Sequence, residues 1–197
     1  MHTISTKDRI LDSALTLFSE KGYDGVGVDL IAEKAGLKGP SLYKHFKGKE
    51  EILDALIGKV ETYYEENFGS EMNPGDIPSS MEELIESSLR RIRFTIRDDT
   101  IKKTRRILMM EQFRSHRIAK LASKHSLDGI QFMYRILLQG MMDTGVLRQE
   151  DSDLLSMELV SPIALLIQMC DREPEREPEA MERIEALLRH FARVYGA

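Results

Sequence analysis

The chain has 197 residues, of which 42% are hydrophobic and 31% are charged, and its formal net charge is -5. This composition is close to that of globular proteins and excludes wholesale disorder, which needs low hydrophobicity and a large charge imbalance. Cys170 is the single cysteine, so the chain can form neither an internal disulfide nor a cysteine zinc site, and we predict no metal and no cofactor.

The N-terminal residues carry charges and no continuous apolar stretch, so the sequence does not predict a secretion signal, and we expect a cytoplasmic protein. The most apolar run, residues 159–170, is interrupted by Ser161, Pro162 and Gln168. A membrane-spanning helix needs roughly 20 apolar residues. The run is shorter than that, and it predicts a buried helix without contact to a membrane.

Apolar residues recur at the helical period through nearly the whole chain, which predicts an all-α fold. Ser5 offers an N-cap and Gly22 a stop for the first helix. Gly36 ends a second short helix, and Pro40 opens a third that is expected to reach Phe46. A longer amphipathic helix follows, and a linker rich in glycine and proline comes after it.

Ser80 begins the next helix with a capping box, and helical periodicity continues nearly to the end of the chain. Gly145 ends one of these helices, and Pro162 is expected to kink another. The only alternating pattern, residues 25–28, is too short to predict a strand. From residue 49 onwards we expect helices over residues 49–68, 80–97, 100–114, 116–144, 154–169 and 178–195.

Positive charge gathers near the N-terminus of this acidic chain. Residues 1–49 hold eight Lys or Arg and six Asp or Glu, a net of +2, which leaves -7 for the other 148 residues. Between residues 36 and 49 there are four lysines and no acid. Such a localised patch suits contact with a polyanion such as DNA over a small area, and an ordinary solvated lysine cluster is the alternative.

Residues 27–46 have the pattern of a helix-turn-helix motif. A protein reads bases in a major groove about 12 Å wide with one short helix that a second helix braces from behind. Ala32 supplies the small side chain where the helices cross, and Gly36 allows a left-handed turn. Leu42 and Phe46 would seal the interface. A helical hairpin whose glycine and alanine serve packing alone is the alternative. The outer side would carry Ser41, Tyr43, Lys44 and His45.

Residues 9–56 resemble the N-terminal domain of TetR-family transcriptional regulators. The likeness rests on Ile-Ala-Glu-Lys-Ala-Gly-Leu at 31–37 and Ser-Leu-Tyr-Lys-His-Phe-Lys-Gly-Lys-Glu at 41–50, and it covers about a quarter of the chain. It implies a three-helix DNA-binding domain over residues 1–50 and a helical ligand-binding and dimerisation domain over residues 51–197.

The resemblance also implies which residues contact DNA. They lie on the recognition helix and its entry, and at the start of the fourth helix, where the family places a phosphate contact. Many members have a hydroxyl residue where Gly27 and Lys38 stand, so the capping of the second and third helices is altered here. The expected DNA-binding residues are Lys38, Gly39, Pro40, Ser41, Tyr43, Lys44, His45 and Lys49.

A single recognition helix makes few base contacts, so we expect a homodimer on palindromic double-stranded operator DNA. The helix near residues 154–170 is apolar almost all round, and the last helix carries an apolar stripe, which predicts a four-helix bundle with two helices from each subunit. The resemblance implies the same arrangement, and a thick core within one subunit is the alternative. The expected interface residues are Leu159, Ile163, Leu166, Ile184, Leu188, Phe191 and Tyr195.

The middle helices hold many methionine and aromatic residues, whose flexible or flat apolar side chains suit an adaptable ligand pocket. Ordinary core packing is the alternative. The resemblance implies a pocket bounded by the fourth to eighth helices, and the sequence does not identify its ligand. The candidate lining residues are Tyr64, Met109, Met110, Phe113, His116, Met133, Tyr134, Gln168 and Cys170.

The predicted function is that of a repressor released from operator DNA by a small apolar or amphipathic effector, with the helix over residues 49–68 as the lever. A constitutive DNA-binding dimer or an interaction scaffold without a ligand is the alternative. We do not expect an enzyme. The glycines near residue 25 do not form a dinucleotide-binding loop, and His116 and His125 do not share a helical face.

Overall fold

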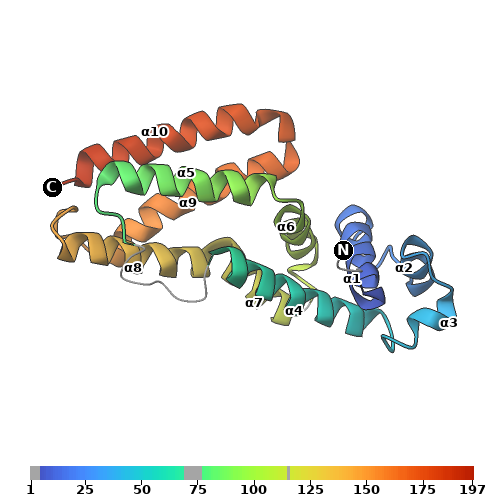
Figure 1. The fold of residues 1–197 in the computed structure, drawn as a ribbon. Helices are drawn as coiled ribbons and strands as arrows, with labels where there is room; N and C mark the ends of the chain where they lie inside the picture. The colour runs from blue at the N-terminus through green and yellow to red at the C-terminus, as the bar shows by residue number, and fades with distance from the viewer. Residues whose placement is uncertain (1–4, 69–76, 115) are drawn as a thin grey trace. The chain divides into compact units, whose positions relative to one another are not determined.

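A computed structural model describes residues 5–68, 77–114 and 116–197, apart from the side chains at positions 64, 65 and 68. Helices make up most of these residues, and no strand occurs among them, so the predicted all-α fold is confirmed (Figure 1). The helices are α1 (Thr6–Lys21), α2 (Val28–Lys34), α3 (Gly39–Leu42), α4 (Lys49–Phe68), α5 (Met81–Arg97), α6 (Asp99–Glu111), α7 (His116–Ser123), π-helix η2 (Lys124–Asp128), α8 (Gly129–Asp143), α9 (Ser152–Arg172), 3-10 helix η3 (Pro174–Arg176) and α10 (Glu177–Tyr195).

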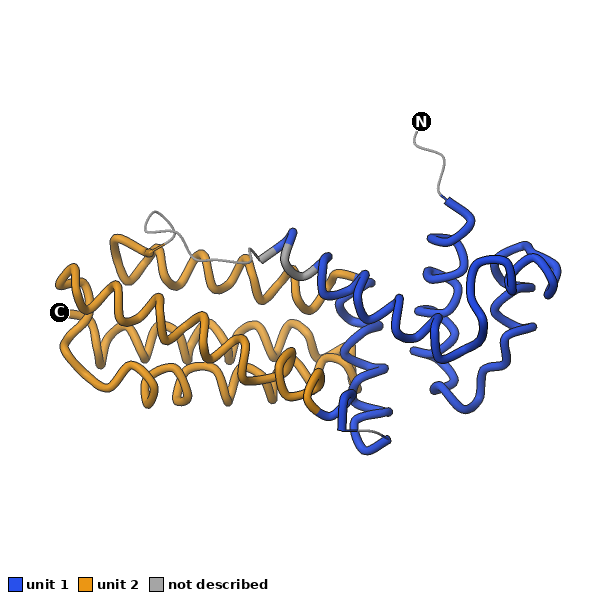
Figure 2. Tube along the Cα trace, turned by 90° about the horizontal axis from the view of Figure 1, so that it is seen from below, with its two compact units in different colours: residues 1–69, 99–119 blue, residues 70–98, 120–197 orange. Residues whose placement is uncertain are grey.

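The chain folds as two compact units, which Figure 2 shows in different colours. Unit 1 comprises Met1–Gly69 and Asp99–Ala119, and unit 2 comprises Ser70–Asp98 and Lys120–Ala197. Helix α6 therefore belongs to the same unit as the predicted DNA-binding segment. The functional division predicted at residue 50 is not tested by this grouping and stays a prediction.

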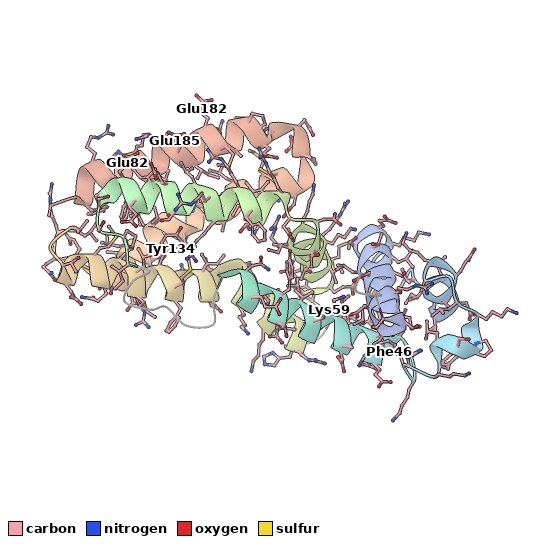
Figure 3. All side chains as sticks on the ribbon, viewed as in Figure 1. Phe46, Lys59, Glu82, Tyr134, Glu182 and Glu185 are labelled. Atoms are coloured by element: carbon pink, nitrogen blue, oxygen red, sulfur yellow. The ribbon has the colours of Figure 1, made fainter. Side chains whose placement is uncertain are left out.

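Helix α1 is the centre of unit 1 and packs against α2, α4 and α6. The hydroxyl oxygen of Ser5 accepts a hydrogen bond from the Asp8 backbone N–H at 3.1 Å, so the predicted N-cap is confirmed. Lys59 of α4, labelled in Figure 3, pairs with Asp8 at 3.2 Å and with Asp12 at 2.8 Å. The Ser5 hydroxyl and the Lys59 ammonium lower the pKa of Asp8. These pairs join α4 to α1 along the outer side of the unit.

Unit 2 is built around a core that α5, α8, α9 and α10 share. Helix α9 lies in the middle of this packing, since it contacts each of the other three. It runs from Ser152 to Arg172 and continues through Pro162, so it is longer than the sequence predicts. Among the described helices, α9 is long and apolar enough to cross a membrane, but a core helix of a globular protein meets the same criterion.

The single helix predicted over residues 116–144 is interrupted. Residues 124–128 form a π-helix, in which the N–H of Gly129 donates to the carbonyl of Lys124, five positions earlier. A Cβ at Gly129 would lie 2.8 Å from that carbonyl oxygen, which is too close, so glycine permits the wider turn. The prediction was wrong here because helical periodicity does not reveal a one-residue bulge.

Candidate nucleic-acid interface

The turn between α2 and α3 has the geometry that a helix-turn-helix requires. Gly36 has a φ of 67°, in the left-handed region that glycine adopts without strain. The N–H of Leu37 donates to the carbonyl of Ala32 at 2.8 Å, and Ala32 is buried. The Arg9 guanidinium of α1 donates to the Ala35 carbonyl and ties the end of α2 to the first helix. The two helices expected on either side of this turn are therefore present.

Both helices of the motif begin without a side-chain cap, as the sequence predicts. Gly27 is the N-cap of α2 and Lys38 the N-cap of α3, and neither side chain makes a capping hydrogen bond. Pro40 lies in the first turn of α3, where its fixed φ suits the helix. Helix α3 is shorter than predicted, because it ends at Leu42 and the chain continues in turns to Phe46.

The segment from α3 to α4 has one buried side and one exposed side. Leu42 is fully buried and Phe46 is 2% exposed, whereas Tyr43 is 54% exposed. Figure 3 labels Phe46. Lys44 and His45 are also exposed. The outer side of this segment is called the reading face below. It is completed by Lys38 and Pro40, which are exposed, and by Gly39 and Ser41, which are partly exposed.

The lysines of the reading face keep their charge free of acid partners. Among the described residues, no carboxylate oxygen lies within 4.0 Å of the ammonium groups of Lys38, Lys44 or Lys47. Helix α4 does begin with Glu50 and Glu51, but the Glu51 carboxylate accepts a hydrogen bond from the Lys47 backbone N–H at 2.5 Å. These three lysines therefore have no acid partner among the described residues, although Asp29 lies beside Gly39, and their charge favours contact with phosphate.

Lys49 differs from the other candidates because its side chain is engaged inside the protein. Its Nζ donates to the carbonyl oxygen of Tyr23 at 2.8 Å and lies 4.1 Å from the centre of the Tyr23 ring. A lysine ammonium has three donors, so one contact of this kind does not use its full capacity. The expected phosphate contact of Lys49 has an internal competitor and stays a prediction.

The turn after α1 is held by residues that the sequence analysis did not single out. The N–H of Tyr23 donates to Glu111 Oε1 at 2.9 Å. The Arg114 guanidinium lies 4.1 Å from the centre of the Tyr23 ring and donates to Asp24 Oδ1 at 2.6 Å. Together with the contacts of Lys49, these are called the Tyr23 contacts. They join positions 26, 88 and 90 apart in the sequence, so no local pattern reveals them.

The Tyr23 contacts also change the ionisation of the turn. The hydrogen bond from Arg114 lowers the pKa of Asp24, and burial raises the pKa of Tyr23. Asp24 is therefore ionised and Tyr23 neutral near neutral pH. The negative charge of Asp24 is matched by Arg114, so the acid does not cancel the positive charge of the reading face.

The nine candidate pocket residues divide between the two units. Met109, Met110, Phe113 and His116 belong to unit 1, where Phe113 is 92% exposed. The side chain of Tyr64 lies outside the described residues. In unit 2, Tyr134 and Cys170 are buried in the core, Met133 packs against it, and Gln168 is partly buried. A ligand pocket therefore stays a prediction, with Met133 and Tyr134 as neighbours on α8.

Most of the predicted dimer-interface residues are already covered by their own chain. Side chains in the core of unit 2 offer little surface to a second copy, and the predicted seam stays a prediction. The outward side of α9 carries Leu154, Met157 and Leu165, and Leu165 is 64% exposed. Of the predicted interface residues, Leu159, Ile163, Ile184, Leu188 and Phe191 are buried, whereas Leu166 and Tyr195 are partly buried.

Comparisons with known proteins agree with this geometry. Residues 10–56 match the family model described as bacterial regulatory proteins, tetR family. The chain is 47% identical over 58 residues to IcaR of Staphylococcus epidermidis, a negative transcriptional regulator of the biofilm operon icaADBC. That match covers 29% of this chain and 31% of IcaR, so the chain spans less than a third of the relative it matches.

Solved structures extend the likeness to the whole fold. The complex of SmeT with triclosan superimposes with a TM-score of 0.73 at 20% identity, covering 98% of this chain and 92% of SmeT, and SmeT is the repressor of the Stenotrophomonas maltophilia multidrug efflux pump SmeDEF. CprB of S. coelicolor A3(2), a TetR family protein, gives a TM-score of 0.67 at 19% identity, covering 98% and 90% of the two chains. At these identities the likeness concerns the fold alone. The likeness to the tetR family model therefore concerns residues 10–56, and the likeness of the rest of the chain is one of fold.

Proposed function

We propose that the protein is a transcriptional repressor that binds operator DNA in the cytoplasm as a homodimer. The observation that carries this proposal is the two-sided segment after α2, in which Leu42 and Phe46 are buried while Tyr43, Lys44 and His45 face solvent. The outer side carries lysines without acid partners among the described residues, together with side chains that can form hydrogen bonds, which suits contact with a polyanion. The names of the relatives support the same function, since IcaR is a negative regulator and SmeT a repressor.

The residues of the reading face divide by chemistry. Ser41, Tyr43 and His45 carry groups that can donate and accept hydrogen bonds, so we assign them to base edges and the adjacent backbone. Lys38, Lys44 and Lys49 are assigned to phosphates, which bind strongly but carry no sequence information. Gly39 and Pro40 let the chain enter the groove closely.

The homodimer is needed because one short helix contacts too few bases for useful specificity. We assign the seam to the outward side of α9, where Leu154, Met157 and Leu165 are exposed. Exposed leucine and methionine side chains on one side of a helix are typical of a surface that a partner covers. A palindromic operator with half-sites about 34 Å apart would match such a dimer.

Effector binding is the second part of the proposed function. The SmeT complex contains triclosan, a small and largely apolar molecule, which supports a small-molecule effector here. To weaken operator binding tenfold, an effector must prefer the released state by about 1.4 kcal/mol. Helix α4 links Lys49 with the rest of unit 1, so a tilt of this 20-residue helix is the proposed route of release.

Selection of bound sequences from a random duplex pool tests the DNA-binding function. We expect a palindrome, and we expect the affinity for it to fall steeply with salt. Lys44→Ala should weaken binding to all sequences and flatten the salt dependence by about one charge, whereas Lys120→Ala, at an exposed lysine of α7, should change neither. Absence of an enriched sequence, together with salt-independent affinity, would refute the proposal and favour a scaffold.

A further inference from the structure

Three arginines of unit 2 are partly buried, and two of them have acid partners. Arg135 on α8 lies 3.4 Å from a carboxylate oxygen of Asp153. Arg176 pairs with Glu179 at 2.9 Å and with Glu173 at 3.2 Å. Pairing of this kind is expected, because a guanidinium that has lost part of its water needs hydrogen-bond acceptors and a compensating charge.

Arg91 of α5 is the exception. Its Nη1 donates to the thioether sulfur of Met133 at 3.3 Å, and within the described part of the chain no carboxylate oxygen lies within 4.0 Å of it. A guanidinium has five N–H donors, and a thioether is a weak acceptor. Among the described residues, Arg91 therefore has no acid partner, and most of its hydrogen-bonding capacity is unused.

Ser88, Arg91 and the Tyr134 hydroxyl form a small polar cluster next to the apolar core of unit 2. Ser88 and Arg91 lie one turn apart on α5, and they face Met133 and Tyr134 of α8. Figure 3 labels Tyr134. The Tyr134 hydroxyl donates to Ser88 Oγ at 2.9 Å, and both residues are buried. Burial raises the pKa of Tyr134, and the nearby charge of Arg91 acts in the opposite direction.

The unmatched N–H groups of Arg91 are open to a ligand. Among the described side chains, no nitrogen or oxygen atom is fully buried without a hydrogen-bond partner. The guanidinium nitrogens of Arg91 that do not bond to Met133 are therefore not fully buried. Ligand sites typically combine apolar walls with a few polar groups that fix orientation. Met133 and Ile130, which pack on the core of unit 2, supply apolar surface on the same helix as Tyr134.

We propose that Arg91 binds the anionic head group of an amphipathic small molecule, a carboxylate, sulfonate or phosphate, whose apolar body lies against Met133. Planar guanidinium groups bind such head groups with two parallel hydrogen bonds, which the thioether cannot accept. The regulatory meaning of this site rests on the proposed function, because only a repressor would release DNA in response. Binding of the anion itself does not depend on it.

Two fluorescent probes with the same aromatic body test the proposal on the full chain. They are 8-anilinonaphthalene-1-sulfonate, which is anionic, and N-phenyl-1-naphthylamine, which lacks the sulfonate. The chain has no tryptophan, so its own fluorescence interferes little. We expect Arg91→Gln to weaken binding of the anionic probe about tenfold and to leave the neutral probe unchanged. Arg90→Gln, at the exposed neighbour that pairs with Glu86, is the matched control and should change neither.

The probe titrations have results that support the proposal and results that overturn it. A loss of threefold or more that is confined to the anionic probe and absent in Arg90→Gln supports the proposal. A smaller loss, an equal loss for both probes, or no saturable binding of the anionic probe overturns it. Operator binding is measured separately, so a protein that binds no DNA refutes the proposed function without changing the reading of the probe titrations.

A structural role for Arg91 makes a different prediction. If Arg91 served the fold, Arg91→Met would lower the melting temperature of the probe-free protein. An unmatched guanidinium predicts instead that Arg91→Met leaves the melting temperature unchanged or raises it, because methionine fits apolar surroundings. Arg91→Lys keeps the charge and should retain binding of the anionic probe better than Arg91→Gln. A marked fall in melting temperature in Arg91→Met would overturn the proposal.

Discussion

The reading face of unit 1 and the core of unit 2 are held by contacts of very different range along the chain. The reading face depends on neighbours such as Leu37 with Ala32 and Phe46 with Leu42. In unit 2, the buried Tyr134 hydroxyl donates to Ser88 across 46 positions, and a pair at the surface joins Arg97 to Glu177 across 80. Short-range constraints leave a pattern in the sequence, and long-range ones do not.

The largest difference in stability is expected between alanine substitutions on the buried side and on the exposed side of the segment from α3 to α4. Phe46→Ala removes a buried ring and should lower the free energy of unfolding by about 3–5 kcal/mol. Tyr43→Ala, at an exposed ring, should change it by less than about 0.5 kcal/mol and yet weaken operator binding. Urea unfolding followed by circular dichroism, with DNA titrations, measures both. If Tyr43→Ala lowered the free energy of unfolding as much as Phe46→Ala, the Tyr43 side chain would be packed in the protein and would not be available to DNA.

In unit 2 the sharpest contrast is between the two sides of α9. Leu165→Glu places a charge on the exposed side and should raise the dimer dissociation constant about thirtyfold while the fold persists. Leu159→Glu places the same charge in the core and should unfold unit 2. Sedimentation velocity over a concentration series distinguishes them. A Leu165→Glu protein that dimerises as before would move the seam to another surface.

Two glycines test whether the turn of the motif requires its left-handed backbone. Gly36→Ala should lower stability by about 1–2 kcal/mol, because its φ of 67° strains any residue with a Cβ. Gly58→Ala lies inside α4 with no atom within 4 Å of the new Cβ, and it should raise stability by about 0.5–1 kcal/mol. Thermal and urea unfolding give both values. A Gly36→Ala protein as stable as the parent would mean that the turn relaxes without cost.

A smaller effect is expected at the Tyr23 contacts. Arg114→Gln removes the ion pair with Asp24 and the charge over the Tyr23 ring, so operator affinity should fall by about threefold. The salt dependence should stay the same, because Arg114 acts through the turn and releases no counterion from DNA. Arg106→Gln, at an exposed arginine of α6, is the control. A flatter salt dependence would mean that Arg114 itself contacts phosphate.

The smallest effect concerns pH. Arg114 lowers the pKa of Asp24 below its ordinary value of 3.8, so the pair contributes stability above that pH and loses it as the pH falls through the lower folded-state pKa. A carboxyl titration by NMR should place Asp24 below 3.8 in the native protein. In Arg114→Gln it should move upward. An unchanged titration would show that another group holds Asp24 ionised.

The fold class and the helix-turn-helix segment were predictable because each helix carries its own start and stop. Ser5, Gly36 and Pro40 act on neighbours a few positions away, and they occupy the expected places. The end of α3 was less predictable, because apolar spacing continues to Phe46 although the helix stops at Leu42.

The sites outside the motif were less predictable. Apolar periodicity shows that Leu159 and Ile184 face inward, but it does not show whether their own chain or a second copy covers them, and their own chain does. Glu111 and Arg114 act on the turn after α1 across most of unit 1, which no spacing rule anticipates. Arg91 could not be singled out from the sequence, because what distinguishes it is the lack of an acid partner among the residues that the structure describes.

The π-helical turn at residues 124–128 has a consequence for how such a protein changes in evolution. A π-helical turn holds one residue more than an α-helical turn, so it takes up an additional position within a single turn and lets the following helix keep its facing. Met133 and Tyr134 therefore keep the side that meets Ser88 and Arg91. Gain or loss of one codon at this turn can thus be absorbed locally, and related proteins can differ in length here without repacking α8.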